Sequence, residues 1–158
     1  MLNFEDQELN FSIPFLQPKK DKTKIIRITL WIGAVVDFYF AIAMMHPRLW
    51  ALTLQMPDYR PDALHRMDMS IGAAVWFGWT LLLIWASFKP VQRKMVLLLT
   101  ILIIAELMVA ATALILNNLN SFEKMVPVFM LQVFLLTIFS ISFLKAKKFE
   151  AQENKENG

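Results

Sequence analysis

Two acidic side chains stand in the middle of long apolar segments of this chain, where ionisable residues are rare. Asp37 interrupts the run 28–45, and Glu106 interrupts the run 95–119. Asp37 lies 12 residues beyond Ile25, and Glu106 lies 11 residues beyond Met95. At 1.5 Å per helical residue, each acid is therefore about 16–18 Å from the start of its helix, near the middle of a bilayer. An ionised acid at that depth costs at least about 2.5–3.5 kcal/mol. The chemistry that these residues suggest is therefore the binding of a proton or a cation.

Small residues share a helical face with each acid, which predicts that both side chains point into a helical bundle. The small residues within one turn of Asp37 are Gly33, Ala34 and Ala41, and those one and two turns after Glu106 are Ala110 and Ala113. Small residues let membrane helices approach closely, because lipid supplies no hydrophobic drive between helices. The two helices would run in the same direction. We therefore expect the two acids at matched depth, facing each other across the bundle axis.

No lysine or arginine lies at mid-span to pair with either acid. Either the acids are protonated at neutral pH, or a cation, a ligand or a partner's basic residue neutralises them. A glutamine in the last segment can bond to a protonated acid, and two tryptophans add ring faces that attract positive charge. Together these form a candidate proton or cation site: Asp37, Glu106, Gln132, Trp76 and Trp79. The alternative is that the acids are hydrogen-bonded glue and the tryptophans ordinary packing.

Four apolar segments carry these residues, and each is long enough to cross about 30 Å of hydrocarbon as a helix. The predicted spans are residues 25–45, 69–88, 95–116 and 125–144. Hydrophobic residues make up 57% of the 158 residues, above the ~45–50% of soluble domains. The sequence therefore predicts an all-α fold, a four-helix transmembrane bundle over residues 25–144, surrounded by a lipid bilayer.

Basic residues are distributed unevenly, and this predicts the orientation of the bundle. Twelve lysines and arginines flank the spans on the side that holds both termini, against four on the other side. The positive-inside rule then makes residues 1–24 and 145–158 cytoplasmic tails. We expect the polar stretch 151–158 to be disordered. The four opposite residues are Arg48, Arg60, Arg66 and Lys124.

The connections between spans predict which helices are neighbours. Those at Lys89–Lys94 and 117–124 are short, so the second helix should pack on the third, and the third on the fourth. The longest connection, 46–68, predicts a short interfacial helix near Pro47–Met56, because proline suits a first helical turn. Asn120 and Glu123 suggest a capping box for the last helix, although Pro127 would then kink it.

Motifs for catalysis or metal binding are weak. Histidine and aspartate in the outward connection are residue types that ligate zinc, but their spacing matches no ligand motif, and solvated loop residues are the favoured interpretation. These residues are His46, Asp58, Asp62, His65 and Asp68. The chain has no cysteine and no recognised nucleotide, hydrolase or zinc-protease motif. We predict no catalytic residue, no cofactor and no metal.

The segment Gly78–Ala86 (GWTLLLIWA), followed by 89–94 (KPVQRK) and 96–100 (VLLLT), resembles a group of small bacterial four-helix membrane proteins. The similarity covers the second and third spans and the connection between them. No activity is assigned to that group, so no site residue is carried over. The resemblance implies location in a bacterial cytoplasmic membrane.

Three functions remain open at this point. The first is a small binding or accessory membrane protein whose partner is a second copy or another membrane protein. The second is a proton-coupled carrier of a small cationic or amphipathic solute, with Asp37 and Glu106 as exchange site. The third is a lipid-modifying enzyme that uses the same two acids. The basic residues lie in the tails and loops, so nucleic acid is not an expected partner.

Overall fold

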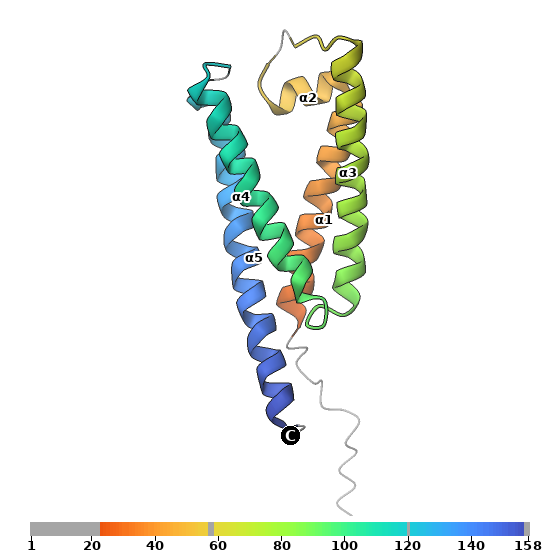
Figure 1. Ribbon diagram of the computed structural model, residues 1–158, viewed down its shortest axis with the longest axis vertical. Coiled ribbons are helices and arrows are strands. Elements are labelled where there is room, and N and C mark those ends of the chain that lie inside the picture. Colours follow the sequence, from red (N-terminus) through yellow and green to blue (C-terminus); the bar gives the residue numbers. More distant parts are fainter. Residues whose placement is uncertain (1–22, 57–58, 120, 157–158) are drawn as a thin grey trace, which may run out of the picture.

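The computed structural model describes residues 23–56, 59–119 and 121–156. Within them the chain forms five helices (Figure 1): α1 (Lys24–Met45), α2 (Pro47–Thr53), α3 (Ala63–Phe88), α4 (Lys94–Leu116) and α5 (Phe122–Glu156). All except α2 are long and apolar enough to cross a membrane. The predicted all-α fold with four membrane-length helices is confirmed, and the chain is a multi-pass membrane protein. Most of the predicted tail 1–24 lies outside the described residues.

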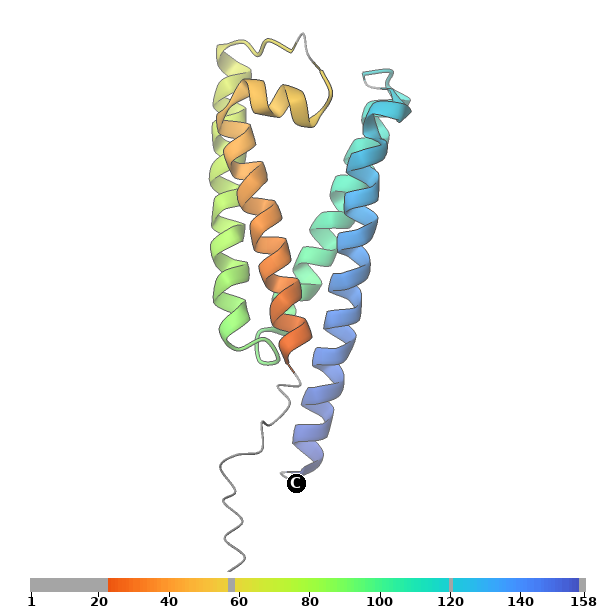
Figure 2. The same cartoon turned by 180° about the vertical axis from the view of Figure 1, so that it is seen from behind.

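The long helices form two pairs that meet at one end of the molecule. α1 packs mainly against α3, α4 packs mainly against α5, and α1 also contacts α5. Figures 1 and 2 show the pairs close together near the α3–α4 connection and separated toward the end that carries α2. The start of α1 and the end of α5 lie at the same end (Figure 1). α1 and α4 share few close contacts, if any.

One of the two predicted neighbour pairs is wrong. α4 packs against α5 as expected, but α3 and α4 share only sparse contacts and diverge from their connection (Figure 2). A short connection fixes only the helix ends that it joins. Further along, α3 follows α1, where Leu83 reaches the backbone of Gly33. Packing between side-chain surfaces, not the length of the connection, therefore selects the partner of α3.

The ends of the helices around the longest connection follow local capping rules. Pro47 opens α2, so the predicted short helix is confirmed over Pro47–Thr53. α3 begins at Ala63, six residues before the predicted span. The reason is an N-cap, because the carboxylate of Asp62 accepts a hydrogen bond from the backbone N–H of His65 at 2.8 Å.

α5 is longer than the sequence suggested. It continues past Pro127 and runs to Glu156, so the expected disorder of residues 151–156 is wrong. An ion pair between Lys94 and Glu150 ties this extension to the start of α4. Asn120, the predicted cap of this helix, lies outside the described residues.

The tightest packing lies at the end where the two pairs meet. Phe139 of α5 is fully buried and contacts α1 at Gly33, where an added Cβ would be 2.6 Å from the Phe139 ring. Nearby, the buried hydroxyl groups of Thr29 and Ser142 are hydrogen-bonded at 2.7 Å. Gly33 is therefore the position where α1 and α5 approach through a missing side chain.

We predict that Gly33→Ala lowers the melting temperature of the purified protein. The added methyl group overpacks the contact with Phe139, which typically costs about 1–3 kcal/mol. Gly78→Ala is the matched control, because a Cβ there meets nothing within 4 Å. Thermal unfolding in detergent should show a loss for Gly33→Ala and none for Gly78→Ala. Equal effects of the two substitutions would contradict this account of the α1–α5 contact.

Candidate functional site

A cavity of about 210 Å³ lies between the two helix pairs. It begins at Gly33 and Phe139, where the pairs meet, and extends to Trp50 and Leu54 at the α2 end. Every helix of the described chain contributes to its wall. Nearly all of the lining side chains are apolar. Apart from two tryptophans, the side chains with polar groups are those of Asp37, Thr100 and Gln132.

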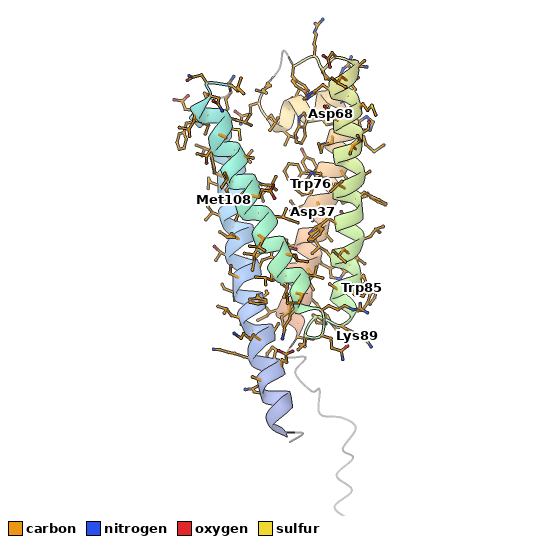
Figure 3. All side chains as sticks on the ribbon, in the orientation of Figure 1. Asp37, Asp68, Trp76, Trp85, Lys89 and Met108 are labelled. Carbon is orange, nitrogen blue, oxygen red and sulfur yellow. The ribbon has the colours of Figure 1, made fainter. Side chains whose placement is uncertain are left out.

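Asp37 is the only acid among the described residues that line this cavity. Its side chain is 7% exposed, and it makes no hydrogen bond or ion pair with any described residue. Figure 3 shows Asp37 near the middle of the bundle, close to Trp76. The prediction that Asp37 faces the interior is confirmed. The reason is local, because Gly33, Ala34 and Ala41 on the same face are also buried.

Gln132 is the second polar group of the cavity without a partner. The side chain is 8% exposed, and its Oε1 atom has no hydrogen bond within the part of the chain that the structure describes. Buried polar atoms are normally paired, and leaving one unpaired costs about 1–3 kcal/mol. The cavity therefore contains two acceptor groups, from α1 and α5, that lack donors.

Aromatic rings form one wall beside the acid. Phe40, one turn after Asp37, stacks on Trp76 with ring centroids 5.4 Å apart and an angle of 30°. Trp50 meets Phe40 edge-on at 6.4 Å. Trp50 lines the cavity because α2 folds back over α1. A hydrogen bond of 2.9 Å between the hydroxyls of Tyr39 and Thr53 joins these two helices.

Two residues of the predicted site do not line the cavity. Glu106 is exposed and absent from the lining, so the prediction of two acids facing each other is wrong. Leu107 and Ala110, its neighbours on α4, do line the cavity, so the wall passes beside Glu106 without including its side chain. Trp79 is also outside the lining, and its indole N–H donates to the hydroxyl of Thr100 at 3.3 Å. Trp79 thus links α3 to α4.

Thr100 was not recognised from the sequence. Its hydroxyl accepts the bond from Trp79 and donates to the carbonyl of Val96 at 2.8 Å. It lies on the wall of the cavity, which is otherwise lined mainly by apolar side chains. A threonine in an apolar span commonly bonds to its own helix, so the residue type alone did not predict the hydrogen bond with Trp79.

The described histidines and aspartates of the connection 46–68 do not assemble into a metal site. Among the described residues, no group of three or more His, Asp or Glu side chains could hold a metal ion. The carboxylate of Asp62 caps α3, and the ring of His65 packs edge-on against Tyr59 at 5.6 Å. Asp58 lies outside the described residues.

Comparison with protein-family models, curated proteins and solved structures finds no match to this chain. The structure shows a small protein with four long apolar helices, and no family is identified for it.

We predict that Gln132→Leu raises the melting temperature of the ligand-free protein. Leucine keeps a similar volume and removes an unpaired buried acceptor, so a stabilisation of about 1–3 kcal/mol is expected. Gln92→Leu, at an exposed position, is the control and should change little. Thermal unfolding of both variants in detergent provides the test. A marked destabilisation by Gln132→Leu would mean that Oε1 has a structural partner.

Proposed function

We propose that this protein binds a small lipophilic cation, such as an amine with an apolar tail, in the cavity between its helix pairs. The observation that carries the proposal is Asp37, a buried acid on an apolar cavity with no partner among the described residues. A buried carboxylate is stable only when it is protonated or paired. An ammonium group would supply the missing opposite charge, and the apolar wall suits the rest of such a ligand.

The other cavity groups also fit a ligand that donates hydrogen bonds and carries positive charge. The Oε1 atom of Gln132 is an acceptor without a donor, and an ammonium group has several N–H donors. The rings of Phe40, Trp50 and Trp76 lie along the same wall. Ring faces attract cations by about 0.5–2 kcal/mol, more strongly where water is excluded. Acceptors and ring faces together disfavour an anionic ligand.

Access through the bilayer is supported by a neighbouring hollow between α1, α2 and α5. It shares four lining residues with the main cavity: Val36, Phe40, Val128 and Leu131. Its lining is also almost entirely apolar. We therefore infer that the ligand enters from the lipid phase between α1 and α5, after partitioning into the membrane.

The carrier and the lipid-modifying enzyme have less support than binding. Both interpretations required two acids in one cavity, so that one could donate a proton while the other accepted one. Because Glu106 is exposed, we propose neither. A binding or accessory membrane protein needs only the single acid.

We further propose that the termini lie in the cytoplasm of a bacterial cell and that the α2 end faces outward. The excess of basic residues beside the termini supports this orientation. Fusions of a folding-dependent fluorescent protein and of a periplasm-dependent phosphatase to the C-terminus provide the measurement. We expect a fluorescent first fusion and an inactive second one. The reverse pattern would overturn the orientation but not the binding proposal.

Octylamine is a suitable probe of the cavity, with 1-octanol and octanoate as neutral and anionic counterparts of equal chain length. We predict that octylamine raises the melting temperature of the purified protein more than either counterpart, because a ligand that binds the folded state stabilises it by mass action. Asp37→Asn should abolish the preference for the amine. Glu106→Gln is the matched control, because it removes the other mid-span acid, and it should retain the preference.

If Asp37→Asn keeps the preference for octylamine over 1-octanol, the acid does not recognise the cation. Loss of the preference in Glu106→Gln alone would move the site to the exposed face of α4. Equal stabilisation by all three compounds in the wild-type protein would indicate nonspecific partitioning into detergent.

A further inference from the structure

A second hollow, different in character from the cavity around Asp37, lies at the end of the molecule that carries α2. It encloses about 620 Å³ between the end of α1, the start of α2 and the segment that leads into α3. Three arginines from separate parts of the chain converge on it: Arg48 from α2, Arg60 from the connection and Arg66 from α3. His46 lies on the same hollow. No described side chain of its lining is acidic.

The positive charge of this hollow is largely unneutralised within the part of the chain that the structure describes. Neither Arg48 nor Arg60 makes a hydrogen bond or ion pair there. Arg66 differs, since its Nε donates to the carbonyl of Pro61 at 3.3 Å, which folds the side chain back toward the connection. Its terminal guanidinium nitrogens make no bond with a described residue.

Asp62, which follows the lining residue Pro61 in the chain, is already engaged. The carboxylate of Asp62 accepts the N–H of His65 and caps α3. Burial, and to a smaller degree the charge of Asp62, raise the pKa of the Tyr59 hydroxyl above its usual range. Asp62 is therefore close to the hollow but not part of its lining, and its capping bond holds it at the helix end.

We propose that this hollow binds a phosphate group through Arg48, Arg60 and Arg66. The planar guanidinium fork pairs with phosphate oxygens through two parallel hydrogen bonds, and arginine is the residue best suited to this geometry. The hollow lies where membrane-length helices end, which is the level of lipid headgroups. The phosphate therefore belongs to an anionic phospholipid or to a free phosphate ion. This site takes a charge opposite to that of the Asp37 cavity and is independent of it.

The test uses the purified full chain in a nonionic detergent. Short-chain phosphatidylglycerol is titrated in one arm and inorganic phosphate in the other, with binding followed by native mass spectrometry and by thermal shift. The variant is Arg48→Gln/Arg60→Gln, because neither guanidinium has a partner among the described residues and the fold should persist. The control is Lys147→Gln/Lys148→Gln, which removes two charges from exposed positions of α5.

We expect the arginine variant to bind phosphatidylglycerol at least tenfold more weakly than the wild type, and the lysine control to remain within twofold. Binding of inorganic phosphate with the same arginine dependence would identify the phosphate group alone as the ligand. Binding of the lipid only would identify the headgroup together with its chains. Both results support the site, and together they show whether the phosphate group comes from a lipid or from the free ion.

Equal affinity in the arginine variant and the wild type would overturn the proposal. An equal loss in the lysine control would overturn it too, because the attraction would then be a property of net charge. If the glutamine variant fails to fold, Arg48→Lys/Arg60→Lys decides the question, since it keeps the charge but not the planar fork. At least a threefold loss is expected for the lysine replacements, and no loss would refute specific phosphate recognition.

Discussion

An acid removed from water requires a proton or an opposite charge, and this requirement shapes the interior of the protein. Asp37 is buried on a cavity wall where no described side chain meets it with a donor or a cation. In lipid the surroundings cannot substitute for water, so the acid must be satisfied inside the bundle. Gln132 adds an acceptor in the same position. The interior therefore holds an acid and an amide oxygen that no described side chain supplies with a donor or a cation.

The two helix pairs explain why there is room for such a group. Gly33 lets Phe139 approach α1 closely, and the bond between Thr29 and Ser142 lies in the same contact. These interactions close the bundle at one end, while the pairs separate toward the other (Figure 2). α2 then covers part of the separated region and contributes Trp50 to the wall. The cavity is thus a consequence of packing concentrated at one end.

The sequence predicted the inward face of a helix correctly where small residues mark one side of that helix. On α1, Gly33, Ala34 and Ala41 mark one face, and Asp37 lies on it, so its inward direction followed from the spacing. On α4 nearly every residue is apolar, so no asymmetry distinguishes the inward face. Ala110 lines the cavity as its small size suggested, but Glu106, one turn before it, does not. A small residue one turn away therefore does not fix the direction of a neighbouring acid.

Other features depend on contacts between distant segments and had no local signal. The return of α2 toward α1 involves the pairing of Tyr39 with Thr53, and only this return brings Trp50 to the cavity. The preference of α3 for α1 over α4 comes from the fit of their side chains, which the length of a connection does not reveal. The basic hollow similarly combines Arg48, Arg60 and Arg66 from three segments, where the sequence showed only scattered charges.

The most direct test of the central claim is an infrared difference spectrum of the protein with and without octylamine, read in the carboxyl-stretching region. If Asp37 is the counter-ion of a bound cation, the wild type should show a change in a carboxyl band that disappears in Asp37→Asn and remains in Glu106→Gln. A spectrum without a ligand-dependent carboxyl band, or one that persists in Asp37→Asn, would contradict the account.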